Sequence, residues 1–192
     1  MKPSELFSIL RVAEKLKCNT RHSYTSSGRH ESVAEHSWRI SLMAMLIAPE
    51  FPEADMDKVI RMCLIHDLGE AFTGDIPAFD KTQADVDAED SAFDAWVQTL
   101  PEANRETFSA LLLEMNALET QEAKIYKALD KLEAVIQHNE ADIATWLPLE
   151  YDLQLQYGRE NVAFSPWFRQ LKQELDQWTR DKIARERKLQ SE

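Results

Sequence analysis

The chain has 192 residues, of which 44% are hydrophobic and 29% charged, a composition that excludes wholesale disorder. Its net charge of −12 argues against a nonspecific grip on a nucleic acid polymer or an anionic membrane, because both need a basic surface. A small phosphorylated substrate is still allowed, since a metal ion and a few cations can reverse the sign of a pocket. The longest apolar run, residues 40–48, is far shorter than the roughly 20 residues of a membrane span, and the N-terminus has no signal-peptide pattern. We therefore expect a cytoplasmic protein with no membrane partner.

The residue types favour helices throughout. Alanine, leucine, glutamate, lysine and glutamine dominate, and alternating β-branched runs are scarce, so the sequence predicts an all-α bundle. The first helix is expected to start with Ser4 as its cap and to bury one face as far as Leu16. Residues 18–30 are rich in Ser, Thr, Arg and His, which is typical of a functional loop.

Two helices follow this loop. Residues 32–35 (Ser-Val-Ala-Glu) match a capping box, which predicts a buried helix that continues to Pro49 and carries His36 in its first turn. A third helix is expected from about residue 55 to 68, with Gly69 ending it. The next residues, 70–79, are expected to form a turn.

The second half of the chain is also expected to be helical. Start signals stand at Thr120 and at Ser165 followed by Pro166. The predicted helices cover residues 83–99, 104–118, 121–140, 148–157 and 166–187. We expect one domain over residues 1–192, with a functional core at about 5–140 and C-terminal helices at about 148–187.

The most informative feature is the pair His66-Asp67 at the end of an apolar helix. A neutral imidazole and a carboxylate can bind one cation together, although such pairs also arise by chance. Residues 59–65 make the helix strongly buried, so an ionised Asp67 needs a metal ion or an arginine as its partner. Glu70 and Asp75 follow within one short turn, and carboxylates this dense in an apolar setting favour a hydrolytic site.

Two further residues are weaker candidates. His36 begins a buried helix, but a solvent-facing histidine fits that position as well. Asp130 lies beside the apolar stripe of the helix at 121–140, as Glu133 does, and an exposed face fits both. Periodicity alone does not select Asp130 over Glu133 or Glu122.

The order His36, His66-Asp67, Asp130 resembles the H…HD…D pattern of the HD-domain superfamily. Residues 31–37, 65–77 and 128–133 are similar to the branch that contains bacterial 5′-deoxynucleotidases and the eukaryotic HD-domain-containing protein 2. The resemblance extends loosely over residues 5–140. It implies an all-α HD fold in which those four residues bind one divalent ion (Mn²⁺, Co²⁺, Fe²⁺ or Zn²⁺). It also implies an enzyme that removes the 5′-phosphate from deoxyribonucleoside monophosphates.

The same resemblance assigns roles around the metal. Glu70 and Asp75 correspond to catalytic acidic residues beside the attacking water and the substrate. Arg21 matches an arginine that contacts the phosphate. His22 departs from the pattern, because the bacterial enzymes have a tryptophan at this position, beside the sugar. The predicted preference for deoxyribose therefore depends on a position, residue 22, where this chain differs from the bacterial enzymes.

Other contacts and functions fit the sequence as well. Arg39, one helical turn after His36, and Lys81 are further candidates to bind the phosphate. One alternative function is hydrolysis of another phosphate ester or a signalling nucleotide. Relatives that cleave cyclic dinucleotides often carry extra metal-ligand histidines, whereas His138 is the only histidine after Asp67. A second alternative is a non-catalytic helical adaptor. The resemblance also predicts a homodimer.

Overall fold

Helices make up nearly all the regular structure in residues 1–189, the part of the chain that the computed structural model describes. The prediction of an all-α bundle is confirmed. In chain order, the elements are α1 (Pro3–Cys18), β1 (Thr20–Tyr24), β2 (His30–Ser32), α2 (Val33–Ile47), the 3₁₀ turn η1 (Ala48–Glu50), α3 (Met56–Ile65), α4 (Glu70–Thr73), α5 (Gln83–Val97), α6 (Glu102–Ala117), α7 (Gln121–Glu140), the 3₁₀ turn η2 (Ile143–Thr145), α8 (Glu150–Gln156) and α9 (Pro166–Leu189).

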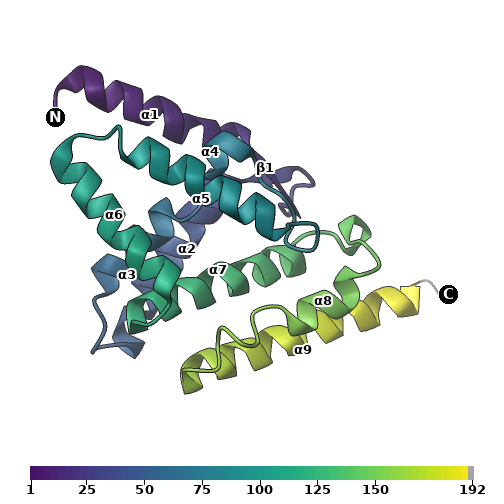
Figure 1. Ribbon diagram of the computed structural model, residues 1–192. Helices are drawn as coiled ribbons and strands as arrows, with labels where there is room; N and C mark the ends of the chain where they lie inside the picture. Colours follow the sequence, from purple (N-terminus) through teal and green to yellow (C-terminus); the bar gives the residue numbers. More distant parts are fainter. Residues whose placement is uncertain (190–192) are drawn as a thin grey trace.

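Helix α7 organises the bundle. It packs against α2, α3, α6, α9 and β1, and Figure 1 shows it running through the middle of the molecule with α8 and α9 below it. Helices α2 and α3 pack against each other, and α5 packs against α4 and α6. This arrangement brings the start of α2, the end of α3 and the middle of α7 together.

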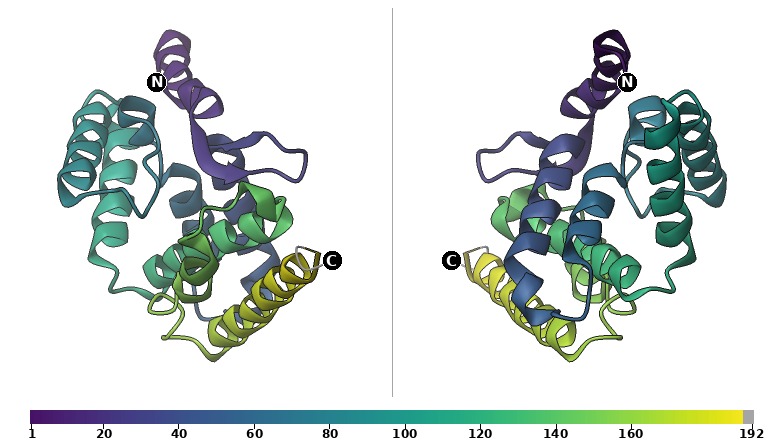
Figure 2. Two further views of the ribbon diagram at one scale, coloured as in Figure 1. Left: turned by 90° about the vertical axis from the view of Figure 1, so that its right-hand side faces the viewer. Right: turned by 90° about the vertical axis from the view of Figure 1, so that its left-hand side faces the viewer.

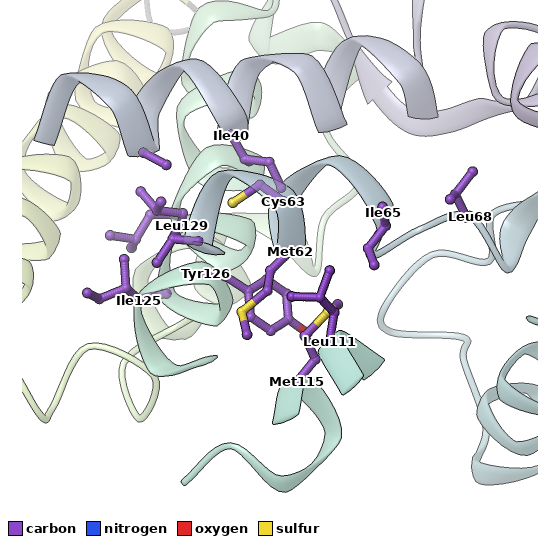
Figure 3. Close-up of a cluster of buried hydrophobic side chains, with 14 of the residues drawn as sticks. Ile40, Met62, Cys63, Ile65, Leu68, Leu111, Met115, Ile125, Tyr126 and Leu129 are labelled. Carbon is purple, nitrogen blue, oxygen red and sulfur yellow. The ribbon is translucent and has the colours of Figure 1, made fainter. Parts of the chain in front are cut away.

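The core lies where α2, α3, α6 and α7 meet. Figure 3 shows Ile40 of α2, Met62 of α3 and Leu129 of α7 converging there, and all three are fully buried. Burying a side chain of this size stabilises the fold by about 1.5–3 kcal/mol. Cys63, also in this core, is a buried free thiol. Within residues 1–189, no helix has the length and apolar character that membrane crossing requires.

The expected loop at residues 18–30 is instead an antiparallel hairpin, formed by β1 and β2. Thr20 pairs with Ser32 and Tyr24 with His30, with an irregular register between them, and the hairpin projects from the body in Figure 2. The turn contains Gly28, whose φ of +83° favours glycine. The strands lack an apolar alternation because polar groups occupy their inner face, which is why the pattern did not predict them.

Most of the residues predicted to begin helices do so in the structure. The capping box begins α2, and the side chain of Thr120 caps α7 by accepting a hydrogen bond from the N–H of Ala123. Ser165 likewise accepts from the N–H of Phe168 at 3.4 Å. Ser4 was wrong as a cap, because α1 begins two residues earlier than a cap at Ser4 requires, with Lys2 at the N-cap position and Pro3 as the first helical residue.

The expected end of the third helix was also wrong. Helix α3 stops at Ile65 rather than near residue 68, and Gly69 has an ordinary right-handed φ of −58°. The glycine is needed for space: a Cβ there would lie 2.7 Å from Cγ of Glu89. The expected turn after it contains α4. The pair His66-Asp67 therefore lies in the connection between α3 and α4.

Candidate metal centre

His36 lies in the first turn of α2 and is fully buried, which rules out the solvent-facing alternative. The capping box fixes where this helix begins. Ser32 Oγ accepts a hydrogen bond from the N–H of Glu35 at 3.3 Å, and Glu35 Oε2 accepts one from the N–H of Ser32 at 2.9 Å. Val33 and Ile40, three residues before and four after His36, are also buried, so His36 belongs to the inward face.

His66 and Asp67 meet it from the end of α3. The Nδ1 atom of His66 lies 2.9 Å from the carbonyl oxygen of Cys63, which can only accept, so Nδ1 carries the proton and Nε2 the lone pair of a neutral ring. His66 Nε2 lies 3.0 Å from Asp67 Oδ2, and His36 Nε2 lies 3.9 Å from the same oxygen. The candidate ligand atoms of these three residues all fall within 4.8 Å of one another.

Asp130 of α7 completes the group. Its Oδ1 atom lies 3.4 Å from His36 Nε2 and 3.9 Å from His66 Nε2. The other oxygen contacts Lys127 Nζ at 3.1 Å and Lys131 Nζ at 3.3 Å. Asp130 is thus buried between two histidines and two lysines, and the exposed-face alternative is wrong.

The histidine nitrogens supply the structural test of metal fit. His36 Nε2 and His66 Nε2 are buried and have no hydrogen-bond partner among residues 1–189. Leaving such polar atoms buried without a partner is costly. Two imidazole nitrogens facing two carboxylates form a donor set that suits a divalent transition-metal ion. The four side chains therefore fit one metal ion.

A buried carboxylate contacts the ring nitrogen of His36 that does not face the metal centre. Glu133 Oε2 lies 2.5 Å from His36 Nδ1, and both side chains are fully buried. Burial and the charge of Arg21 oppose protonation of His36, but Glu133 and Asp130 raise its pKa to about 9. Carboxylates in this position orient metal-binding histidines and increase their basicity. The sequence pattern could not assign this role, because Glu133 and Asp130 lie equally beside the stripe of α7.

The two carboxylates of the centre are ionised. Burial opposes this, but His66, His36 and Arg21 hold the pKa of Asp67 well below its usual range. Burial likewise opposes ionisation of Asp130, and its two lysine neighbours hold the pKa of that carboxyl well below its usual range. Both groups are therefore ready to bind a cation at neutral pH.

Glu70 and Asp75 behave differently. Burial, followed by the negative charges of Asp67 and Asp75, raises the pKa of Glu70 to about 10. Burial also raises the pKa of Asp75, although Arg21 partly offsets it. Perturbed acidic groups beside a polar cavity are candidates for proton transfer.

Two cavities adjoin at Arg21 and Asp75. The larger, about 1090 Å³, is lined by His66, Asp67 and Asp130 together with Glu70 and Lys81. The smaller, about 480 Å³, has His22 and the apolar side chains of Phe79 and Leu153 in its wall. Arg21 contacts Asp67 Oδ2 at 3.4 Å through Nη1 and Glu31 Oε2 at 3.4 Å through Nε.

The HD domain family model matches residues 13–172. The chain belongs to the HD domain family. It is 32% identical over 139 residues to the 5′-deoxynucleotidase HDDC2 of Homo sapiens, covering 70% of this chain and 67% of that protein. It is also 32% identical over 145 residues to the HDDC2 protein of Dictyostelium discoideum, covering 70% and 76%.

A solved HD structure has the same architecture. The crystal structure of a predicted metal-dependent phosphohydrolase from Magnetospirillum magnetotacticum MS-1 superposes with a TM-score of 0.78 at 29% identity. The match covers 95% of this chain and 93% of that one. The resemblance to HD phosphohydrolases of the 5′-deoxynucleotidase branch, recognised in the sequence, is confirmed.

The HD fold brings most of the expected site residues together, but not all. Lys81 lines the larger cavity and pairs with Glu89 at 2.5 Å. His22 lines the smaller cavity. Arg39 contacts three side chains of α7: Glu140 at 2.7 Å, Gln137 at 2.8 Å and Glu133 at 3.6 Å. Arg39 does not line either cavity, and its contact with the phosphate stays a prediction.

Proposed function

We propose that the protein is a metal-dependent phosphohydrolase that removes the 5′-phosphate from deoxyribonucleoside monophosphates. The observation that carries the proposal is the convergence of His36, His66, Asp67 and Asp130, with two unpartnered imidazole nitrogens buried between two ionised carboxylates. The relatives named 5′-deoxynucleotidase support the substrate class.

These four side chains would hold one divalent ion, and their nitrogen and oxygen donors suit Mn²⁺, Co²⁺, Fe²⁺ or Zn²⁺. When bound, the ion would supply Lewis acidity that withdraws negative charge from the phosphate. Glu133 would hold His36 in the orientation that directs Nε2 inward. Cys63, through its carbonyl oxygen, would do the same for His66.

Two acidic residues would move the protons of hydrolysis. Burial and neighbouring negative charge keep a proton on Glu70, so this residue would donate to the oxygen of the leaving sugar. Asp75, whose pKa is raised but partly offset by Arg21, would accept the proton from the attacking water. The products are inorganic phosphate and a deoxyribonucleoside.

Arg21 would orient the substrate. Its side chain borders both cavities, so a phosphate that contacts it in the larger cavity leaves the smaller cavity for the nucleoside. Phe79 and Leu153 would supply apolar surface there, and His22 would lie near the sugar or base. Lys81 would add positive charge to the phosphate side.

Phosphate release from a panel of nucleotides tests the substrate class. Deoxyribonucleoside 5′-monophosphates, their ribonucleoside counterparts and deoxyribonucleoside 3′-monophosphates would be compared with Mn²⁺ or Co²⁺ present. We expect release from the 5′-deoxy compounds and much less from the other two groups. Equal activity on both sugars, or none on either, would defeat the assignment.

We further propose a homodimer and a cytoplasmic location. Trp38, Leu42 and Met45 lie on one face of α2 and are exposed, which supports an apolar contact between copies. Light scattering should give twice the mass of one chain for the wild type and the mass of one chain for Trp38→Glu. A monomeric wild type would remove the dimer.

A further inference from the structure

A second group of metal-binding side chains lies outside the HD motif. His22 of β1, His138 near the end of α7 and Glu150 at the start of α8 converge on the wall of the smaller cavity. Glu150 Oε1 lies 2.9 Å from His138 Nε2 and 3.3 Å from His22 Nε2. The ligand atoms of all three residues fall within 4.8 Å of one another.

The hydrogen bonds around His138 direct a lone pair toward Glu150. His138 Nδ1 lies 2.9 Å from the carbonyl oxygen of Ala134, which can only accept, so Nδ1 carries the proton. In the neutral ring, Nε2 then has a lone pair that faces a carboxylate oxygen, and two acceptors at 2.9 Å repel each other. A cation between them, either a proton or a metal ion, removes the conflict.

Glu150 is prepared as an anionic ligand. It is 1% exposed, and its second oxygen accepts a hydrogen bond from the N–H of Leu147 at 2.7 Å. Burial opposes ionisation, but the contact with His138 and the hydrogen bond from the N–H of Leu147 lower the pKa of Glu150. The first oxygen is left to the two imidazoles.

The imidazole rings are held by their packing. His22 makes an edge contact with Phe79, with ring centroids 5.4 Å apart, and His138 makes one with Trp146 at 6.1 Å. The three ligands come from β1, α7 and α8, so the cluster is built by the tertiary fold. It shares no residue with the group of His36, His66, Asp67 and Asp130.

The spacing matches a metal site. Ligand atoms about 2.0–2.1 Å from a zinc-like ion stand roughly 2.9–3.4 Å apart when they occupy adjacent positions. The two distances to Glu150 Oε1 fall in this range. Two histidines and one glutamate favour Zn²⁺, Co²⁺ or Ni²⁺ over Mg²⁺ and Ca²⁺, which prefer oxygen ligands alone.

The geometry points to a second transition-metal site in this protein, formed by His22, His138 and Glu150 and selective for a Zn²⁺-class divalent ion. Three protein ligands leave a coordination position open toward the cavity. A water molecule, or a nitrogen or oxygen atom of a molecule bound in the cavity, completes the coordination there. The site binds its ion independently of the HD centre.

Titration of the metal-free full-length protein with Co²⁺, followed by visible absorption and by metal analysis after dialysis, tests this site. We expect the Asp67→Ala variant to bind one equivalent of Co²⁺, and the Asp67→Ala/His138→Ala variant to bind none. Asp67→Ala/His22→Ala should behave as the His138 double variant does. His30, an exposed histidine of the same hairpin, provides the matched control, and Asp67→Ala/His30→Ala should keep its equivalent.

The outcomes separate the two metal sites. Absence of Co²⁺ binding in folded Asp67→Ala, or its persistence in both cluster double variants, overturns the second site. If the wild type binds Co²⁺ and Asp67→Ala does not, the result would still support the HD centre. Loss of one equivalent in His138→Ala but not in Asp67→Ala would support the second site and count against the HD centre. Circular dichroism would confirm that each variant is folded.

Discussion

Replacing Glu133 with glutamine should change how metal binding depends on pH. Glu133 Oε2 lies 2.5 Å from His36 Nδ1 in a fully buried pair. Burial and Arg21 oppose protonation of His36, yet Glu133 and Asp130 raise its pKa to about 9. The metal-free protein therefore carries an imidazolium at neutral pH, and an ion that binds Nε2 must displace a proton.

The size of this effect follows from the pKa. At pH 7, about two units below it, displacing the proton costs about 3 kcal/mol, because one unit corresponds to about 1.4 kcal/mol. The metal affinity of the wild type should rise about tenfold per pH unit between about pH 7 and 9. In Glu133→Gln the pKa of His36 should return toward about 6.5, so the affinity should be nearly flat over this range.

Calorimetric titration of the metal-free protein with Mn²⁺, repeated across this pH range, measures the slope. The slope is more decisive than one affinity, because losing the carboxylate that orients His36 also weakens binding by about 10–100-fold. Glu140→Gln, on the same helix but paired with Arg39, is the control and should keep the wild-type slope. A flat wild-type profile, or an unchanged slope in Glu133→Gln, would show that Glu133 does not raise the pKa of His36.

The same shift affects folding of the metal-free protein, with a defined sign. Because the pKa of His36 is raised in the folded state, its stabilising contribution is fully present below about pH 6.5. The contribution is lost as the pH rises through about 9. Urea unfolding of the metal-free protein should therefore show a decline over this interval that is smaller in Glu133→Gln.

Three substitutions test the surrounding fold. Gly69→Ala would place a Cβ 2.7 Å from Cγ and 3.2 Å from the carbonyl oxygen of Glu89. Urea unfolding should therefore show a free energy of unfolding lower by about 1–3 kcal/mol. An unchanged midpoint would contradict the close packing. Leu129→Ala, in the fully buried core, should cost about 2–5 kcal/mol in the same assay, and a loss well under about 1 kcal/mol would mean that the core is less tightly packed. Ser32→Ala should lower the free energy of unfolding by about 1 kcal/mol, because it removes the cap of α2. The control Ser26→Ala, at an exposed position in the hairpin turn, should change the melting temperature little. Equal effects of the two substitutions would count against the cap.

The predictable parts of the fold depend on local interactions. The capping box of α2 and the cap of α7 involve residues only three positions apart, so the sequence shows both partners together. The short hairpin at residues 20–32 depends on pairing between two strands with polar side chains on their inner face, including Ser23 and Glu31. No apolar alternation marks it, and it was therefore missed.

In the metal centre, too, the sequence predicts the features that depend on neighbouring residues and does not predict those that depend on distant contacts. His66-Asp67 could be recognised because a buried helix leads directly into it. Asp130 and Glu133 could not be distinguished by periodicity, since the contact with His36 that separates their roles spans α2 and α7. Family resemblance supplied Asp130, but Glu133 became visible only in the structure. The cluster of His138 and Glu150 likewise depends on contacts between distant segments.

The Asp67→Ala variant tests whether His36, His66, Asp67 and Asp130 hold a metal ion that phosphate release requires. Metal content and phosphate release from a deoxyribonucleoside 5′-monophosphate would be measured beside Asp57→Ala, an exposed aspartate in the first turn of α3. We predict that Asp67→Ala loses one equivalent of metal and all phosphate release while its circular dichroism stays helical, and that Asp57→Ala keeps both. Unchanged metal content and full turnover in Asp67→Ala would show that this residue is not a ligand of a catalytic metal.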